Sequence, residues 1–456
     1  MQLKFLGAAG TVTGSSYVLT SGSDKSILID LGMFQGPTEI ESLNRESYDY
    51  DTNLLSGAVL THAHLDHCGR LPIILKGGYS GNIWMTPPTR DLTEITLLDA
   101  AKIAKDDLPR RQAGGKEILY DRNLATQTIL KFETVEYRTP KQIGDFMVTF
   151  RDAGHILGSA FLEITDMSPN SEIKKIVFSG DLGNTPEALE QETELVSSAD
   201  AVVIESTYGD KLHPEGSPVD ALTFEINEIE KTGGALLIPA FSLDRTQELM
   251  HMIMHLKKEG KVKPDTQVYM DSPMAEKATR VYVNYPKDFN PHIQNDLKIG
   301  DIFDFPGLNI ISGGKESEGL HASPGPKVII AGSGMMTGGR IVGHAGYYLP
   351  IASTRLLIVG YQGEGTLGRE LFEGKKDIRI ERMNVKVNAT VTSIQTMSSH
   401  ADQKQLMDWL AHIKNVKKVF ITHGEDGPRE ALSKLISDKL GIRDITLPIL
   451  NQEVEF

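Results

Sequence analysis

The sequence THAHLDHCGR, residues 61–70, places three histidines and an aspartate within six positions, at His62, His64, Asp66 and His67. Extended backbone points residues i, i+2 and i+4 to one side, so the first three share a face, and a turn at the fourth returns it to the same centre. Burying such groups without partners costs free energy. Neutral imidazole and carboxylate are good zinc ligands, so this stretch predicts a metal site.

The same arrangement, an apolar strand that ends in an acid or a histidine, recurs along the chain. IVFSGD ends at Asp181, AVVIES contains Glu205, VFITHG contains His423, and DAGHILGS adds His155. Sites in layered α/β folds gather where strands end, so we expect these segments to converge near residues 61–70. A second metal about 3.5–4 Å from the first requires a bridging carboxylate, and Asp181 is the natural candidate.

Length and composition indicate a globular chain of more than one domain. The chain has 456 residues, of which 40% are apolar and 24% charged. No apolar run approaches the roughly 20 residues that cross a bilayer, so we expect no membrane contact. The start, MQLKFLGAAGTVTG, favours a first strand over a signal peptide, and Cys68 is the single cysteine, which favours a reducing, cytoplasmic location. The net charge of −14 argues against non-specific nucleic-acid binding unless a local positive site or bound metal overcomes it.

The pattern of apolar residues changes twice along the chain. Alternation in the first thirty residues predicts antiparallel strands, and RLPIILKGG predicts a helix that ends at glycine. From about residue 209 the apolar runs GALLIPAF, QVYMDSP, KVIIAGSG and RLLIVGYQ are typical of buried parallel strands. From about residue 383 alternation returns in NVKVNATVT, with one face formed by Val385, Val387, Ala389 and Val391.

These motifs resemble those of the metallo-β-lactamase superfamily. THAHLDH, GHILGS and SGDLGN match its metal motifs in order, and ILIDLG, with Asp30 at a strand end, matches its first motif. ESTYG, AFSLDRTQELM, AGSGMMTGGR, SSHAD and ITHGE are similar to the β-CASP subgroup, which includes the cleavage and polyadenylation endonuclease. The resemblance covers essentially the whole chain. It implies an α/β fold: a four-layer αββα metallo-β-lactamase domain over residues 1–208 and 383–456, with an α/β β-CASP domain inserted over residues 209–382.

The resemblance also implies a ligand set. Two zinc ions per chain are expected, and manganese stays open as a substitute. One zinc would be held by His62, His64 and His155, and the other by Asp66, His67 and His423, with Asp181 bridging them. Asp30 would support these ligands from behind. A histidine at the position of His423 goes with RNA substrates in this family, so the expected partner is single-stranded RNA.

For catalysis we assign Asp66, Glu205 and His400. The metals would lower the pKa of a bridging water, whose hydroxide attacks the phosphorus in line. His400 would protonate the leaving ribose oxygen, and Glu205 would orient His400. The segment SSHAD also has the composition of a helix N-terminus, with Ser398 or Ser399 as the cap, and the two roles are compatible.

The loop GSGMMTGGR follows a predicted strand, and its backbone N–H groups are suited to phosphate. We therefore expect Ser333, Gly334 and Arg340 to contact the substrate, although a tight turn alone would also explain the glycines. Arg245 is expected at a helix start in an internal salt bridge, and Cys68 is expected to be buried by packing.

The sequence thus predicts a zinc-dependent ribonuclease that acts in RNA processing or decay. Two alternatives stay open. One is a hydrolase of the lactamase fold that acts on a small ester, thioester or lactam, and the other is a non-catalytic RNA-binding relative. Endonucleolytic and 5′-exonucleolytic cleavage are both compatible with the sequence, as is a homodimer.

Overall fold

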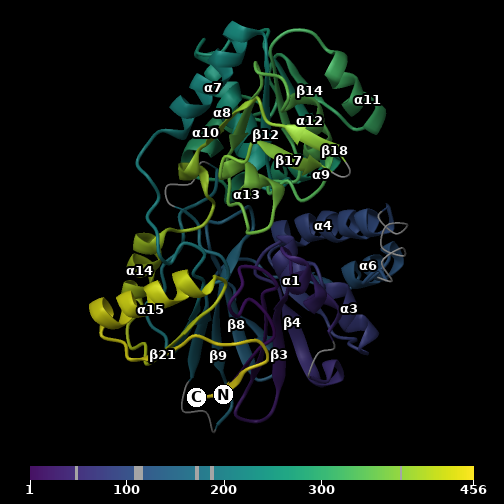
Figure 1. Cartoon of the computed structure of the whole chain (residues 1–456). Coiled ribbons are helices and arrows are strands. Elements are labelled where there is room, and N and C mark those ends of the chain that lie inside the picture. The colour runs from purple at the N-terminus through teal and green to yellow at the C-terminus, as the bar shows by residue number, and fades with distance from the viewer. Residues whose placement is uncertain (47–49, 107–116, 170–173, 185–188, 381–382) are drawn as a thin grey trace. The chain divides into compact units, whose positions relative to one another are not determined.

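The computed structural model describes residues 1–46, 50–106, 117–169, 174–184, 189–380 and 383–456 (Figure 1). The chain forms two compact units. Unit 1 comprises Met1–Leu212 and His400–Phe456, and unit 2 comprises His213–Ser399. The chain leaves unit 1 close to the expected boundary after residue 208, but it returns at His400, which is later than the expected residue 383.

Unit 1 contains two β-sheets, each of seven strands within the described residues. The first sheet has the order β22 (Glu453–Glu455), β1 (Gln2–Phe5), β2 (Ser16–Thr20), β3 (Ser26–Leu31), β4 (Leu55–Val59), β5 (Ile83–Met85) and β6 (Phe132–Thr134). The second has the order β21 (Asp444–Thr446), β20 (Lys418–Ile421), β11 (Ala201–Ile204), β10 (Lys175–Phe178), β9 (Ala160–Asp166), β8 (Phe146–Asp152) and β7 (Lys141–Ile143). The predicted antiparallel pairing of the first three strands is confirmed.

The two sheets pack face to face. In β8 every second side chain is buried, and Phe146 and Phe150 meet Phe5 and Leu19 of the opposite sheet in one apolar core. This alternation is what places one face of each strand against the other sheet.

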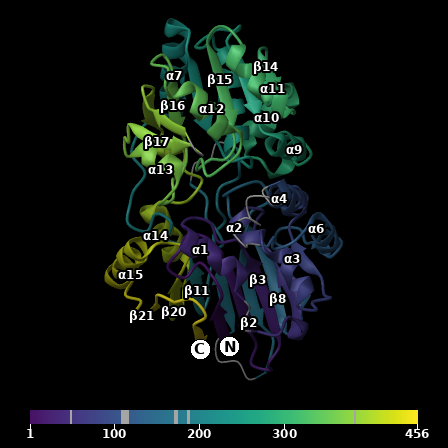
Figure 2. The same ribbon diagram turned by 45° about the vertical axis from the view of Figure 1, so that its right-hand side comes forward.

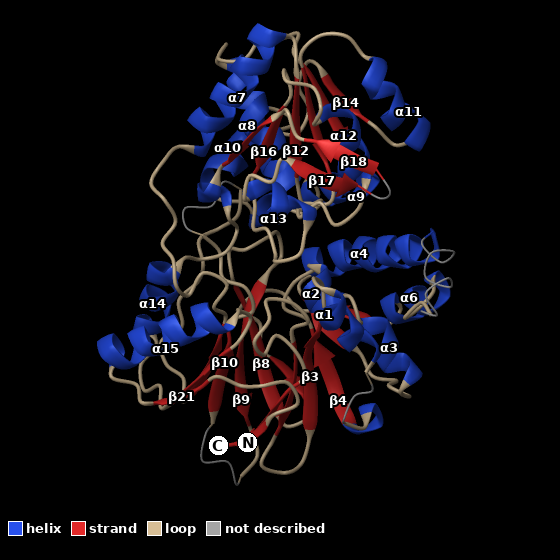
Figure 3. Ribbon diagram, viewed as in Figure 1, coloured by secondary structure: helices blue, strands red, loops and turns tan. Residues whose placement is uncertain are grey.

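Helices cover the outer face of each sheet (Figure 3). Beside the first sheet lie α3 (Leu71–Lys76), α4 (Pro87–Asp106) and α6 (Arg122–Ile129), and beside the second lie α14 (Gln403–His412) and α15 (Asp426–Leu440). Leu71 and Leu97 pack on the first sheet, and Trp409 and Leu432 pack on the second. The order helix, sheet, sheet, helix is the expected αββα arrangement. The predicted helix of RLPIILKGG is α3, which ends at Gly77.

Unit 2 is built on a parallel sheet of six strands among the residues described. Its order is β14 (Leu308–Ile310), β13 (Gln267–Asp271), β15 (Lys327–Ala331), β12 (Ala235–Pro239), β16 (Arg355–Ile358) and β19 (Thr390–Ser393). The predicted parallel runs are therefore β12, β13, β15 and β16. Helix α7 (Pro218–Thr232) precedes the first of these strands. The helices between the strands include α8 (Arg245–Lys258), α9 (Pro273–Tyr282), α10 (Pro291–Ile299), α12 (Arg340–Tyr348) and α13 (Leu367–Phe372).

The segment NVKVNATVT is divided between two sheets. β18 (Met383–Lys386) pairs with β17 (Asp377–Ile380), whereas β19 joins the large sheet beside β16. Val385, Val387 and Ala389 are buried in the core of unit 2, and Val391 packs against it. The shared apolar face is as expected, but it belongs to unit 2, because both strands find their partners there.

Helix α14 is capped by a later residue than the sequence suggested. Its cap is Asp402, whose side chain accepts a hydrogen bond from Gln405 N at 2.9 Å, while Gln405 Oε1 accepts from Asp402 N at 2.9 Å. Ser398 and Ser399 are therefore not the cap. His400 lies before the helix, and its backbone forms an antiparallel bridge with Gly183. The bridge keeps His400 extended, so the helix starts after it.

The two ends of the chain lie together in unit 1 (Figure 2), where β1 and β22 pair antiparallel. None of the helices in the described segments is long and apolar enough to cross a membrane.

Candidate metal centre

The loops that follow five strands of unit 1 carry the predicted ligands. Within the described residues, three groups of ligand-type side chains meet there, each with ligand atoms within 4.8 Å of one another. His62 and His64 follow β4, Asp66 and His67 lie on α2 (Leu65–Cys68), His155 follows β8, Asp181 follows β10, Glu205 follows β11 and His423 follows β20. The expected convergence of these segments is therefore present in the fold.

The first group consists of three imidazole rings. His64 Nδ1 lies 3.1 Å from His62 Nε2 and 3.1 Å from His155 Nε2. Two ligands of a tetrahedral zinc, with bonds of about 2.0–2.1 Å, are about 3.3 Å apart. The donor atoms therefore have the chemistry and the spacing of a metal site.

The second group lies on the other side of Asp181. His67 Nε2 is 3.3 Å from His423 Nε2, and His423 Nε2 is 3.5 Å from Asp66 Oδ2. Two nitrogens and one carboxylate oxygen thus face a common centre, which is again a donor set that suits zinc.

Asp181 contacts both groups, each with a different oxygen. Oδ2 lies 3.5 Å from His62 Nε2 and 3.6 Å from His155 Nε2, whereas Oδ1 lies 3.2 Å from His67 Nε2 and 3.6 Å from His423 Nε2. This is the arrangement that a carboxylate bridging two metal ions requires.

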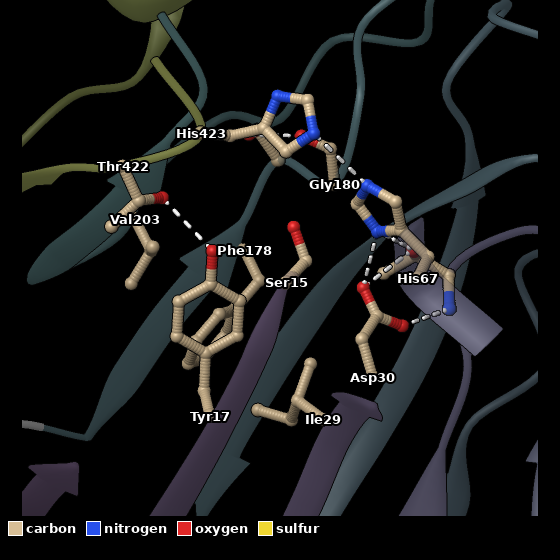
Figure 4. A pocket seen from close by; sticks show the side chains of 12 residues that line it. Ser15, Tyr17, Ile29, Asp30, His67, Phe178, Gly180, Val203, Thr422 and His423 are labelled. Atoms are coloured by element: carbon tan, nitrogen blue, oxygen red, sulfur yellow. Dashed lines mark hydrogen bonds and ion pairs between the residues drawn. The ribbon is translucent and has the colours of Figure 1, made fainter. Parts of the chain in front are cut away.

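Hydrogen bonds to the Nδ1 atoms, on the side of each ring away from the centre, fix the histidines of the second group (Figure 4). Asp30 Oδ2 lies 2.8 Å from His67 Nδ1, and the carboxylate also accepts from Thr61 N and Thr61 Oγ1, each at 2.8 Å. His423 Nδ1 lies 3.0 Å from Thr207 Oγ1. These contacts leave Nε2 of both rings directed to the centre, which is how partners of ligand histidines select the tautomer.

The protonation of the histidines follows from burial and neighbouring charge. Burial lowers the pKa of His62 well below its ordinary value and that of His64 to about 4. Burial also opposes charge on His67, but the carboxylates of Asp181 and Asp30 raise its pKa well above the ordinary value. At neutral pH His62 and His64 are therefore neutral, which is the form of imidazole that binds a metal.

The carboxylates are ionised despite their burial. Burial by itself would raise the pKa of Asp181, but the adjacent His423 and His67 lower it well below its usual range. Burial likewise opposes ionisation of Asp66, but the hydrogen bond from His423 and the charges of His67 and His423 together lower its pKa. Two anions beside neutral imidazoles give the centre an affinity for cations.

Glu205 and His400 form a pair beside Asp181. His400 Nδ1 lies 3.3 Å from the Glu205 carboxylate and 4.0 Å from Asp181 Oδ2. Burial would lower the pKa of His400, but Glu205 raises it to about 9. His400 therefore holds a proton at neutral pH.

The remaining predicted residues lie elsewhere. Ser333 and Gly334 are in the loop between β15 and α12 of unit 2, and Arg340 is the first residue of α12. The guanidinium of Arg340 donates to Asp271, to Ile311 O at 2.9 Å and to Ser312 O at 2.7 Å, so it is held inside unit 2.

Arg245 and Cys68 are placed as expected. Arg245 begins α8 and forms an internal ion pair with Glu248, and its other nitrogen donates to Ser399 Oγ at 2.8 Å. Cys68 is buried, and its thiol donates to Ala63 O at 3.4 Å.

Thr61 and Thr207, which fix Asp30 and His423, were not identified from the sequence. Both threonines neighbour motif residues, which is the only signal that could have pointed to them.

Models of known families match three segments of this chain. The metallo-beta-lactamase superfamily model matches residues 9–196, the Beta-Casp domain model matches residues 246–371, and the Zn-dependent metallo-hydrolase RNA specificity domain model matches residues 384–448. They follow one another in the order that the motifs predicted.

Related proteins align over nearly the whole chain. Ribonuclease TTHA0252 of Thermus thermophilus is 35% identical over 442 residues, which are 96% of each chain. Transcription termination factor FttA of Methanosarcina mazei is 30% identical over 94% of this chain and 68% of its own length. An RNase J-like protein of Methanocaldococcus jannaschii is 31% identical over 93% of this chain and 92% of its own.

The fold also has a likeness among solved structures. The crystal structure of a protein of unknown function from Enterococcus faecalis V583 is similar, with a TM-score of 0.53 and 12% identity over 99% of both chains. The family models and the relatives that are 30% identical or more show that the chain belongs to the β-CASP nucleases of the metallo-β-lactamase superfamily and is a metal-dependent hydrolase.

Proposed function

We propose that this chain is a zinc-dependent ribonuclease that hydrolyses phosphodiester bonds of single-stranded RNA in RNA processing or decay. One observation carries the proposal. Asp181 lies between two groups of ligand atoms, and the Glu205–His400 pair lies beside it. The choice of RNA is supported by the matched RNA specificity domain and by relatives named ribonuclease and RNase J-like protein.

In this proposal the two groups hold two zinc ions. His62, His64 and His155 would hold one, Asp66, His67 and His423 would hold the other, and Asp181 would be shared by both. When bound, the ions supply Lewis-acid stabilisation of phosphate charge and lower the pKa of water in the site. Manganese is an alternative, because it also accepts imidazole and carboxylate ligands.

The protein itself supplies the proton for the leaving group. The ribose oxygen that leaves needs a proton, and His400 carries one at neutral pH because Glu205 raises its pKa to about 9. Glu205 is fixed in turn, since its carboxylate accepts hydrogen bonds from Leu182 N at 2.7 Å and Thr207 N at 3.3 Å. His400 is therefore the general acid in this proposal, and Glu205 is the residue that positions it.

Substrate contacts away from the metals are assigned to the loop of unit 2. The glycine-rich backbone at Ser333 and Gly334 is suited to a phosphate group. The contacts of Arg340 with Asp271 and two carbonyl oxygens give it a fixed position at the end of this loop, from which it adds positive charge. A homodimer and a cytoplasmic location complete the proposal.

Metal content and substrate hydrolysis, measured on one preparation, test this function. The wild-type chain should cleave labelled single-stranded RNA, lose this activity to a chelator, and hold metal ions that Asp181→Ala removes. Hydrolysis of a chromogenic lactam or a small ester without RNA cleavage would instead identify a small-molecule hydrolase. Binding of RNA without cleavage in the metal-loaded protein would identify a non-catalytic relative. Products from 5′- and 3′-labelled RNA distinguish endonucleolytic from 5′-exonucleolytic cleavage.

A further inference from the structure

A separate group of ligand-type side chains lies in unit 2, on helices α8 and α10 (Figure 1), and the proposed reaction does not use it. His251 and His255 are one turn apart on α8, and His292 and Asp296 are one turn apart on α10. Residues i and i+4 share a helix face, so each helix presents two of these side chains to one side.

Three donor atoms of this group converge on one point. His251 Nε2 and His255 Nε2 are 3.0 Å apart, and they lie 3.4 Å and 3.0 Å from Asp296 Oδ2. His292 Nδ1 is 3.4 Å from the same oxygen. Ligands of a tetrahedral zinc with bonds of about 2.0–2.1 Å are separated by about 3.3 Å, so the atoms of His251, His255 and Asp296 are already spaced as zinc ligands, whereas the ring of His292 approaches only Asp296.

Hydrogen bonds alone do not account for two imidazole nitrogens that face each other. Two imidazole nitrogens that face each other can share one proton, because one of them must be the acceptor. Burial, with a further contribution from His255, lowers the pKa of His251 to about 4, so its ring is neutral at pH 7. Burial opposes ionisation of Asp296, but hydrogen bonds from His251 and His255 lower its pKa. A cation placed between the two imidazole nitrogens of α8 and the carboxylate oxygen of Asp296 would contact all three.

The group is covered on one side and open on the other. The side chain of His251 is 9% exposed and that of Asp296 is 16% exposed, whereas His292 is 75% exposed. A hydrated ion can therefore reach the inner ligands from solvent and lose its water to them. Within the described residues, α10 buries a single side chain, Ile293. A metal link to α8 would thus be a large part of what holds α10 in place.

We propose that His251, His255 and Asp296 bind one zinc ion, that the exposed ring of His292 turns toward it as the fourth ligand, and that this ion anchors α10 to α8. Nitrogen-rich donor sets favour zinc and its neighbours over magnesium or calcium. Four protein ligands leave no open position for a substrate, so the role of this ion is structural. The inference is independent of the ribonuclease proposal, because it uses none of the residues of the centre in unit 1.

Zinc content and hydrogen exchange test the site. The double variant His251→Gln/His255→Gln should contain one zinc equivalent per chain less than the wild type. Zinc added to the apoprotein should slow amide exchange in residues 291–299 of the wild type but not of the double variant. His412→Gln, which changes an exposed histidine on α14, is the matched control and should behave as the wild type. Equal zinc content and equal protection of residues 291–299 in the double variant would overturn the proposal.

The wild-type chain offers a second test that needs no variant to fold. Crystals of the protein grown with saturating zinc should show anomalous scattering at the zinc edge about 2.0–2.1 Å from His251 Nε2, His255 Nε2 and Asp296 Oδ2. A crystal with anomalous peaks in unit 1 and none between α8 and α10 would overturn this site and leave the catalytic proposal standing. RNA cleavage by the double variant is a separate readout, and we expect it to continue.

Discussion

The carboxylate of Glu205 lies 3.3 Å from Nδ1 of His400, a residue 195 positions further along the chain. Glu205 follows β11, and His400 lies where the chain re-enters unit 1. The contact is partly buried beside Asp181, so a proton on His400 is stabilised by the carboxylate next to the proposed metal ions. This pair separates the proposed mechanism from that of a hydrolase that relies on its metal centre alone.

Replacing His400 should slow the chemical step and leave binding intact. We expect His400→Ala to keep its metal ions and its affinity for RNA, while turnover falls by roughly 10²–10⁴-fold, the usual contribution of a general acid. Single-turnover cleavage, metal analysis and RNA binding measured together check this.

Two comparisons sharpen this test. Glu205→Gln should slow turnover less than His400→Ala, because Glu205 orients the acid without donating the proton. A substrate with a better leaving group should restore His400→Ala more than the wild type. Loss of metal from His400→Ala would make the residue a ligand, and full activity with metal bound would place the acid elsewhere.

Cleavage should also depend on pH through His400. Because Glu205 raises the pKa of His400 to about 9, the protonated acid is present below that pH, and turnover should fall as pH rises through it. Glu205→Gln removes the charge that raises this pKa, so the alkaline decline should begin at lower pH. The pH profile of kcat for both proteins is the measurement, and an identical alkaline limb in Glu205→Gln would contradict the assignment.

The residues proposed as metal ligands in unit 1 could be singled out from the sequence because their signal is local. Each one follows an apolar strand within a few residues, and strand ends meet at one edge of a layered fold. The partners that orient the rings could not be predicted. Thr207 is a common residue type, and only the fold brings its hydroxyl 3.0 Å from His423. For His251 and His255 the spacing of four was visible, but Asp296 is 41 positions away from His255 and on another helix.

The pattern of apolar and polar residues does not contain enough information to predict which strands pair or which residue caps a helix. Alternation identified Val385 and Val391 as inward residues, but not that they lie in different sheets of unit 2. Ser398, Ser399 and Asp402 are all good caps. Asp402 is the cap because the backbone of His400 is used in a bridge to Gly183, which depends on tertiary structure.

Replacing Asp181 should reduce the metal content more than replacing a residue that contacts only one of the two groups. Its two oxygens face different groups, so Asp181→Ala should lose both proposed ions, whereas His64→Ala should weaken mainly one. Elemental analysis after dialysis measures this. Asp408→Ala, which removes an exposed aspartate on α14, serves as the control and should keep the full complement. Equal losses from Asp181→Ala and His64→Ala would show that Asp181 is not shared.

Asp30 should act on the metals through His67. Asp30→Asn keeps the shape of the side chain but replaces an oxygen that accepts from His67 or Thr61 by an amide donor. We expect metal affinity to fall by about 10–100-fold, as for other partners of ligand histidines. Competition with a chromophoric chelator measures it. Asp200→Asn is the control, since Asp200 accepts from the backbone N–H groups of Lys174 and Lys175 away from the site, and a similar loss there would point to general destabilisation.

The turn that carries Asp66 depends on Gly32, a residue that is not itself a proposed metal ligand. A Cβ at Gly32 would lie 1.5 Å from Asp66 O, so Gly32→Ala must displace either β3 or the turn that carries Asp66. We expect Gly32→Ala to reduce the free energy of unfolding by about 1–3 kcal/mol or more, the range of overpacked cores, and to weaken metal binding at the same time.

Gly343→Ala is the matched control. Gly343 lies on α12 with nothing within 4 Å of the added methyl group, so alanine should stabilise the helix by roughly 0.5–1 kcal/mol and leave metal affinity unchanged. Denaturant unfolding and metal titration of the two variants measure these effects on stability and metal affinity. Normal metal affinity in a folded Gly32→Ala would show that the turn can move without disturbing its ligands.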